Sequence, residues 1–487
     1  MSTTHGLDLV NVSGDADTSP AELRRLYEAQ RRAFEASPIP DAAARRDALD
    51  RLAETLSRNS LEAAAAISLD FGTRSRHETF LFELVPLRNA IRHARRHVEG
   101  WMRRERRRVT WSWPGKAWVQ YQPLGVVGII GAWNYPLAIA VWPLVDALAA
   151  GNRVLIKAPE LTPNFSALLK RMLGEAFAED QVAIVLGGVE VAEQFCKLPL
   201  DHLFFTGSTA VGRRVMAAAA EHLVPVTLEL GGKSPAIVCP DYKIATAARD
   251  IATGKLHTAG QACLAPDYAL VPAANVRDLA VAVIAESRRL YPSIADESYT
   301  SIVNDRHYAR LQRALNEARD GGAEILSHAD QPAGAVRKIG PTVVLNPPSD
   351  CALMREEIFG PILPIIGYQR LEDAINYVNA RERPLALYCL THDHASRDAV
   401  LSRTVSGGVT LNGTIMHKGQ VDLPFGGVGK SGIGSYHGIA GFRRFSHTRG
   451  VFEVHGLNQV HLLSPPYGRL ARLVIRVLGS RRAADSC

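Results

Sequence analysis

The spacing of apolar residues predicts helices near the start of the chain. After a small, polar opening segment, apolar positions recur at helical spacing from AELRRLYEAQRRAFEA to about Gly100. Ser19 and Pro20 form an N-cap and N1 pair in front of the first helix. We therefore expect a flexible N-terminus over residues 1–19, followed by a mostly exposed helical layer.

The pattern then changes to strands that alternate with helices. The segment VTWSWPGKAWVQYQ at 109–122 predicts a hairpin turned at its Pro-Gly pair. From Leu124 to about Thr209, the strand-length runs VVGIIGAW, RVLIKAP, AIVLGG and HLFFTGS are separated by helical patterns. Such alternation predicts βαβ units in a parallel sheet, with ligands at the carboxyl ends of its strands. A second alternation over about 230–411 predicts a second α/β domain.

The longest apolar stretch, Leu124–Ala150, has the length of a transmembrane span. Asn134 and Pro136 interrupt it, and Asp146 lies within its second half. A β-branched strand pattern also gives way to a helical one, which indicates a buried strand, turn and helix. We expect no integral membrane association.

Composition is that of a globular protein, with 47% hydrophobic and 22% charged residues among 487. This length exceeds one hydrophobic core and predicts two or three packed units. The six cysteines include no CxxC pair, so neither a zinc site nor a secreted disulfide framework is predicted. No secretory signal precedes the first helix, and we expect a reducing, cytoplasmic location and no metal.

The net charge of +7 raises the question of an acidic partner. The segment RHARRHVEGWMRRERRR at 92–108 contains eight of the arginines. It has no interleaved aromatic residue beyond Trp101 and matches no nucleic-acid-binding module, so a solvated helix face and edge-strand charges are favoured. We expect no nucleic-acid partner, although the positive field favours anionic cofactor phosphates.

Two residues are candidates for covalent chemistry. Cys263, in GQACLAPDY, attacks a carbonyl only as a thiolate, and any one of six cysteines is more often a buried apolar side chain. Glu229 ends the apolar strand of VTLELGGKSP, where a raised pKa suits a base acting near neutral pH. A carboxylate pointing to solvent at the strand end is the alternative.

A glycine-flanked turn is a candidate phosphate site. FFTGSTAVG places Gly207 and Gly212 around a strand-to-helix turn, whose N–H groups and helix dipole favour a phosphate. The spacing is GxxxxG, without the GxGxxG fingerprint or a P-loop lysine, so an ordinary turn is an equal alternative.

Polar residues at two other strand ends allow similar alternatives. Lys157 and Glu160 follow a strand and are able to hold vicinal ribose hydroxyls, or to form a surface ion pair. Asn134 offers an amide donor to an oxyanion, or a cap to the helix that begins near Pro136.

Together these segments resemble the aldehyde dehydrogenase superfamily and occur in its order. The motifs are AWNYP at 132–136, IKAPE at 156–160, FTGST at 205–209, LELGGKSP at 228–235, GQAC at 260–263, EEIFGP at 356–361 and PFGG at 424–427. GSTAVG, APDY and SGIGSYHGIAGFRRFSH are similar to the dimeric class 3 branch. YTSIVNDRHYARLQ at 299–312, RTVSGGVTLN at 403–412 and PPYGRL at 465–470 are similar to bacterial coniferyl aldehyde dehydrogenases.

The resemblance implies a mechanism without a metal. Cys263 attacks the aldehyde, and the Asn134 amide and the Cys263 backbone N–H hold the resulting alkoxide. Loss of hydride to nicotinamide then gives a thioester, which water activated by Glu229 hydrolyses to the carboxylic acid. An aromatic aldehyde such as coniferaldehyde is the expected substrate.

The resemblance also assigns cofactor contacts. Lys157 and Glu160 match the adenosine-ribose site, and Glu160 favours NAD over NADP because its carboxylate repels a 2′-phosphate, although dual use stays open. The remaining cofactor positions are Trp133, Gly207, Ser208, Gly212, Leu230, Glu357 and Phe359. Two positions depart from the pattern: Thr258 stands where the family has asparagine, and Gly413 where the coniferyl group has an acidic residue.

The expected fold is α/β and aldehyde dehydrogenase-like, assembled as a homodimer. The predicted units are a flexible N-terminus at 1–19, an NAD-binding domain at 20–106 and 124–231, a catalytic domain at 232–411, an oligomerisation element and active-site border at 107–123 and 412–460, and a C-terminal tail at 461–487. One alternative function is the oxidation of long-chain or a broad range of aliphatic aldehydes, and another is a non-catalytic binding protein on this fold. The tail segment LARLVIRVLG is basic and apolar, and we expect it to dock on the protein rather than on a membrane.

Overall fold

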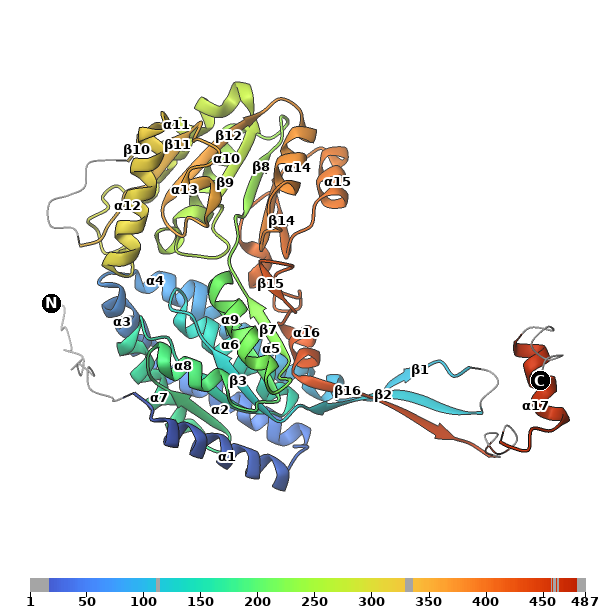
Figure 1. Cartoon of the computed structure of the whole chain (residues 1–487). Coiled ribbons are helices and arrows are strands. Elements are labelled where there is room, and N and C mark those ends of the chain that lie inside the picture. The colour runs from blue at the N-terminus through green and yellow to red at the C-terminus, as the bar shows by residue number, and fades with distance from the viewer. Residues whose placement is uncertain are drawn as a thin grey trace.

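The computed structural model describes residues 17–110, 114–328, 336–456, 458, 461 and 464–479. Most of the expected flexible N-terminus therefore lies outside the described residues, as does part of the expected hairpin turn. Two large sheets with helices on both faces form the body, and a long ribbon extends from it (Figure 1).

The helical layer begins where the capping pattern predicts. Pro20 opens helix α1, and the Ser19 side chain accepts a hydrogen bond from the Glu22 N–H. The helices of this layer are α1 (Pro20–Ala36), α2 (Ala42–Arg58), α3 (Ser60–Phe71), α4 (Arg76–Thr79) and α5 (Val85–Trp101), with a π-helical turn η1 (Phe80–Leu84) between the last two.

The first large sheet has six strands in the order β15-β7-β6-β3-β4-β5. All neighbours are parallel except β15, an edge strand from the glycine-rich tract that runs antiparallel to β7. The strands are β3 (Val126–Ile130), β4 (Arg153–Lys157), β5 (Val182–Val185), β6 (His202–Thr206), β7 (Val226–Glu229) and β15 (Gly432–Ile433). The helices after them are α6 (Pro136–Ala150), α7 (Pro163–Ala176), α8 (Val189–Cys196) and α9 (Thr209–Ala220).

Strand β3 shows why this sheet is buried on both faces. Val127 and Ile129 pack with α2, α5, α6 and α7, whereas Val126 and Ile130 pack with α1, α8 and α9. Alternate side chains therefore enter two separate cores. The prediction of a buried strand, turn and helix over Leu124–Ala150 is confirmed, because every residue of α6 is buried.

The second large sheet has seven strands in the order β10-β11-β12-β9-β8-β13-β14, parallel except for β10. The strands are β8 (Pro235–Val238), β9 (Tyr268–Pro272), β10 (Glu324–Ser327), β11 (Thr342–Leu345), β12 (Ile362–Tyr368), β13 (Ala386–Leu390) and β14 (Gly408–Leu411). The helices are α10 (Ile244–Leu256), α11 (Val276–Leu290), α12 (Asp305–Asp320), α13 (Ala352–Arg355), α14 (Leu371–Asn379) and α15 (His394–Arg403), with short 3₁₀ turns η2 (His257–Gly260), η3 (Ala273–Asn275) and η4 (Met416–Gly419). The predicted second α/β unit is thus present as a sheet.

The ribbon is the third sheet, in the order β1-β2-β16, and is antiparallel throughout. It comprises β1 (Glu105–Arg107), β2 (Gly115–Pro123) and β16 (Ser446–Val454), which follows helix α16 (Gly438–Arg444). The predicted start of the hairpin at Val109 is wrong, because its first strand lies within the basic run. Glu105 explains the difference: its carboxylate accepts hydrogen bonds from Arg107, Tyr121 and Arg443, which hold this stretch extended beside β2.

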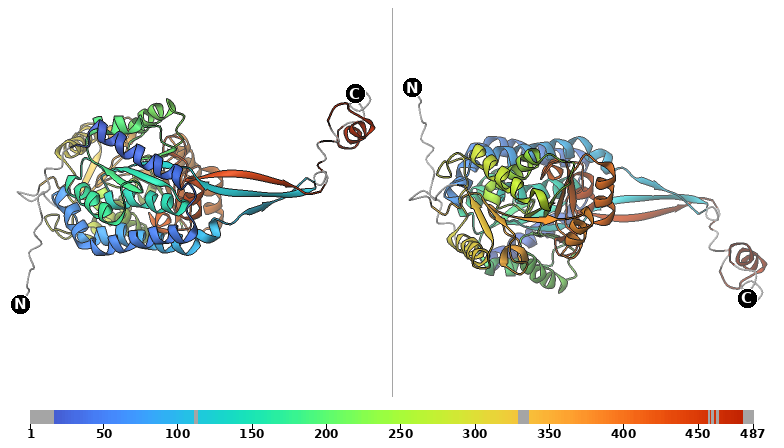
Figure 2. Two further views of the ribbon diagram at one scale, coloured as in Figure 1. Left: turned by 90° about the horizontal axis from the view of Figure 1, so that it is seen from below. Right: turned by 90° about the horizontal axis from the view of Figure 1, so that it is seen from above.

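The tail forms helix α17 (Arg469–Leu478), which lies beyond the free end of the ribbon (Figure 2). The ribbon carries it away from both large sheets of its own chain, and the expectation that the tail docks on the protein rather than on a membrane stays a prediction. Among the described residues, no helix combines the length and the apolar character needed to cross a membrane.

Candidate active site

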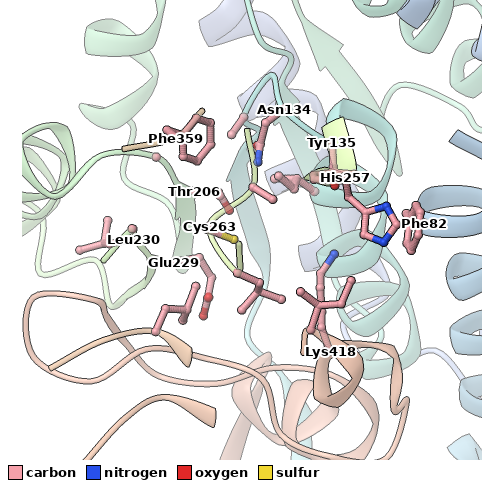
Figure 3. A pocket seen from close by; sticks show the side chains of 18 of the residues that line it. Phe82, Asn134, Tyr135, Thr206, Glu229, Leu230, His257, Cys263, Phe359 and Lys418 are labelled. Atoms are coloured by element: carbon pink, nitrogen blue, oxygen red, sulfur yellow. The ribbon is translucent and has the colours of Figure 1, made fainter. Parts of the chain in front are cut away.

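A cavity of about 520 Å³ collects residues from the ends of both large sheets. Asn134, Glu229 and Cys263 all line it, and Figure 3 shows their side chains around one space. Other residues of its wall that the sequence singled out are Trp133, Gly207, Ser208, Leu230, Glu357 and Phe359. Lys157, Glu160 and Gly212 are not part of the wall.

Cys263 follows the 3₁₀ turn η2 and is partly buried. Burial raises the pKa of its thiol to about 12, against the opposing effect of the Lys418 ammonium, and nearby Glu357 and Glu229 raise it further. The resting thiol is therefore protonated, and attack on a carbonyl requires its proton to be removed.

Asn134 lies in the turn between β3 and α6. Its side-chain Nδ2 donates to the Gln261 carbonyl at 3.1 Å, which links it to the loop that carries Cys263. The helix-cap alternative for Asn134 is wrong, because Tyr135 occupies the N-cap position of α6 and Asn134 faces the cysteine loop instead. An amide has two N–H groups, so one remains for an oxyanion.

Thr258 explains how its loop tolerates a departure from the family pattern. Its backbone is left-handed, with φ 52°, and its N–H donates to Glu78 Oε1 at 2.8 Å. Its hydroxyl lies 3.0 Å from the Tyr135 hydroxyl. Gly260 is also left-handed, and a Cβ there would lie 2.2 Å from the Gly360 carbonyl oxygen. Threonine therefore keeps the loop fastened beneath Cys263.

A buried ion pair positions the turn that carries Asn134. The side chains of Arg74 and Glu83 are fully buried, with 3.0 Å between Nη2 and Oε1. Arg74 Nη1 also donates to the Asn134 carbonyl at 2.8 Å. Glu83 Oε2 accepts from the N–H groups of Leu137 and Ala138, both at 2.9 Å, at the start of α6. The pair thus fixes the backbone from the Asn134 carbonyl to the first turn of α6.

Glu229 ends β7, and its side chain is buried. Neither carboxylate oxygen has a hydrogen-bond partner among the described residues, and burial raises the pKa well above its ordinary value. The solvent-facing alternative for Glu229 is wrong, because the adjacent strand β15 covers this sheet edge. A buried, unpartnered carboxyl of this kind suits a base that acts when substrate arrives.

Glu357 and Phe359 enter the cavity from the segment before β12. Burial raises the pKa of Glu357 to about 8, and its Oε1 has no partner among the described residues. A Cβ at Gly231 would lie 1.9 Å from Glu357 Oε2, so the glycine leaves room for the carboxyl to lie against the backbone. The rings of Phe359 and Trp133 meet edge to face, with centroids 5.4 Å apart.

The turn after β6 has the predicted strand-to-helix form. The Ser208 hydroxyl caps α9 by accepting from the Val211 N–H, and a Cβ at Gly212 would lie 2.7 Å from a Leu230 methyl group. At the end of β4, Lys157 Nζ and Glu160 Oε2 are 2.5 Å apart, with the lysine side chain buried and the glutamate half exposed. The alternative of a surface ion pair therefore fits the half-exposed Glu160 but not the buried Lys157.

Sequence reasoning missed Arg74, Glu78, Glu83 and Lys418. Glu83 stands inside the apolar run FLFELV, a weak signal that its carboxylate is buried. The other three show no local signal, because their partners come from distant segments. Among the described residues, no group of three or more histidine, cysteine, aspartate or glutamate side chains is arranged to hold a metal.

Comparison with known proteins gives a consistent result. The aldehyde dehydrogenase family profile matches residues 11–451. A "Probable coniferyl aldehyde dehydrogenase" of Pseudomonas aeruginosa is 48% identical over 459 residues, covering 94% of this chain and 96% of that protein. The substrate-bound structure of Staphylococcus aureus AldH has a TM-score of 0.89 at 35% identity, covering 94% of this chain and 99% of that one. A Mycobacterium tuberculosis aldehyde dehydrogenase complexed with NAD⁺ has a TM-score of 0.82 at 27% identity, covering 90% and 91%.

We predict that Arg74→Met destabilises the protein by about 3–5 kcal/mol and lowers turnover, because Glu83 loses its buried counter-ion and the Asn134 carbonyl loses its donor. Chemical denaturation and steady-state kinetics measure the two effects. Arg58→Met is the control, because its ion pair with Glu54 is exposed and contributes less than about 1 kcal/mol. Equal stability losses in the two variants would contradict the structural role of Arg74.

Proposed function

Because the chain belongs to the aldehyde dehydrogenase family and is an NAD(P)-dependent aldehyde dehydrogenase, we propose that Cys263 is its nucleophile, Asn134 its oxyanion donor and Glu229 its water base. The observation that carries this assignment is that all three side chains meet in one cavity. The alternative of a non-catalytic binding protein on this fold is wrong.

The proposed reaction begins at the Cys263 sulfur. The Cys263 thiol first loses its proton to solvent. The thiolate then forms a bond to the aldehyde carbon, and the carbonyl oxygen becomes an alkoxide that the second Asn134 N–H stabilises. A bound nicotinamide dinucleotide supplies the hydride acceptor that oxidation requires. Glu229 then takes a proton from water as the water oxygen attacks the Cys263 thioester, the carbon–sulfur bond breaks, and the acid leaves with the thiolate restored.

The residues around the cavity fit such a cofactor. We propose that Lys157 and Glu160 hold the adenosine ribose and that the turn from Gly207 to Gly212, with Ser208, lies against the pyrophosphate. Glu357 supports the fit, because its buried Oε1 is an acceptor without a partner among the described residues. The remaining contacts of the nicotinamide half would come from Trp133, Leu230 and Phe359.

We propose NAD as the preferred cofactor. The half-exposed Glu160 carboxylate is able to accept a hydrogen bond from a free ribose 2′-hydroxyl and would repel a 2′-phosphate. Lys157 moderates this repulsion, because its ammonium is paired with the same carboxylate. Use of NADP at lower efficiency follows from that pairing.

An aromatic aldehyde such as coniferaldehyde is the proposed substrate. Phe82, Tyr135, Trp142 and Phe425 contribute aromatic surface to the cavity wall, which favours a flat ring. The Pseudomonas aeruginosa relative carries coniferyl aldehyde in its name. A long-chain or broad aliphatic preference is the second candidate, since Leu81 and Ile139 add aliphatic surface to the same wall.

We also propose that the protein works as a homodimer in the cytoplasm. The ribbon leaves the body (Figure 2). The exposed side chains of Phe452 and Val454 on β16 are apolar surface that a second subunit would cover. The described cysteines are all free thiols, as expected in a reducing compartment.

We predict that Cys263→Ala abolishes NADH formation while the variant still binds NAD more tightly than NADP. Loss of the sulfur removes the nucleophile and leaves the cofactor contacts intact. Absorbance at the NADH band and calorimetric titration of both cofactors measure these properties. Cys196→Ala, at a buried cysteine outside the cavity, should retain turnover. Turnover by Cys263→Ala would refute the assignment.

We predict that kcat/KM rises as the pH increases from about 6 to about 9, because Cys263 and Glu229 act in their deprotonated forms. Burial raises the pKa of each group, so activity is lost as pH falls. Stopped-flow kinetics at constant ionic strength would record the profile. A flat profile over this range would be incompatible with two buried groups that must ionise.

A further inference from the structure

Lys418 stands in the wall of the same cavity and has no role in the mechanism described above. It belongs to the turn η4, between β14 and the glycine-rich tract, and its side chain points into the cavity that Cys263 and Glu229 also face (Figure 3). Its Nζ lies 5.6 Å from the Tyr135 ring centroid and 5.7 Å from that of Trp142. Two aromatic faces therefore flank the ammonium.

This ammonium has no counter-ion within the described parts of the chain. No described carboxylate lies within ion-pairing distance of Nζ, and Cys263, Glu83 and Glu229 are the acidic groups that act on it from further away. Glu83 is already paired with Arg74 and accepts two backbone N–H groups. Burial raises the pKa of Glu229 well above its ordinary value, which disfavours its charged form. Neither carboxyl neutralises Lys418.

The surroundings of Lys418 make an unpaired cation costly. Burial lowers the pKa of Lys418, and the wall of the same cavity includes the apolar side chains of Leu81, Phe82, Pro86 and Ile139. Removal of a charge from water without a partner is unfavourable. A ligand that brings an acceptor oxygen to this point would recover that cost, while its apolar body fills the rest of the cavity.

We propose that Lys418 recognises aldehydes that carry an acceptor oxygen at the end opposite the carbonyl, most strongly a carboxylate and less strongly a phenolic hydroxyl. The inference rests on the proposed attack of Cys263, which places the aldehyde carbon at the sulfur and leaves the far end to the cavity wall. Lys418 then sets substrate specificity: an ammonium attracts a full negative charge more strongly than a neutral hydroxyl.

A different role would leave a different kinetic signature. Lys418 also lowers the pKa of the Cys263 thiol, so it is the cation that would favour the thiolate. If that were its main contribution, loss of the charge would slow the oxidation of all aldehydes by the same factor, whatever their far end carries.

The test compares kcat/KM for benzaldehyde, 4-hydroxybenzaldehyde and 4-carboxybenzaldehyde in the wild type and in Lys418→Met, which keeps the volume and removes the charge. The ratio of carboxy to unsubstituted substrate should fall by about tenfold or more, and the ratio for the hydroxy substrate by less. Lys418→Arg should preserve the wild-type order. Lys430→Met, at an exposed lysine paired with Glu382, is the control and should change neither ratio.

Unchanged ratios in Lys418→Met, including an equal loss on all three substrates, would overturn the proposal. Hexanal and 6-oxohexanoate form a second pair that differs only at the far end. If the wild type oxidises none of the aromatic aldehydes, the proposed aromatic substrate fails, and the ratio within the aliphatic pair still decides the role of Lys418. Lys418→Gln replaces Lys418→Met in the same comparison if the methionine variant does not fold.

Discussion

The buried ion pair between Arg74 and Glu83 is the interaction on which the site depends. Two charges that are fully removed from water require close partners, and here those partners include the Asn134 carbonyl and two N–H groups at the start of α6. Glu78, a few residues away, accepts hydrogen bonds from Thr258 and Thr300. One short helical stretch, α4 with η1, therefore fastens the loop of the oxyanion donor and the loop of the nucleophile to each other.

The polar groups of this region divide into two kinds. Groups that position the site, such as Arg74, Glu78 and the Gln261 side chain, are paired or hydrogen-bonded. Groups assigned to chemistry or ligand contact are different: neither Glu229 oxygen has a hydrogen-bond partner, and Lys418 has no ion-pair partner, among the described residues. Unpartnered buried groups are costly in isolation, and their interactions become available when substrate enters a cavity from which water is excluded.

Much of the architecture was predictable from sequence because it repeats along the chain. Alternation of strands and helices gave both parallel sheets, and the Ser19–Pro20 pair gave the start of α1. The start of the ribbon was placed too late, because β1 is an arginine-rich strand held by contacts from Tyr121 and Arg443 rather than by apolar alternation. The position of α17 beyond the ribbon was not predicted, since amphipathicity indicates an apolar face but not what covers it.

The candidate site was also predictable only in part. Cys263, Glu229 and Asn134 lie in short motifs with a recognisable order, so sequence was enough to propose them. The supporting residues are far apart in the chain: the Thr258 N–H meets Glu78 across 180 positions. No local periodicity reports such a contact, and the cation at Lys418 becomes informative only once its lack of a counter-ion is known.

The central claim, covalent catalysis at Cys263, is tested most directly by mass spectrometry of Glu229→Gln mixed with NAD and an aromatic aldehyde. Without its water base, the enzyme should accumulate the thioester, and the peptide that contains Cys263 should gain the mass of the acyl group. Absence of this adduct in an enzyme that has formed a single turnover of NADH, or its appearance on another cysteine, would contradict the account.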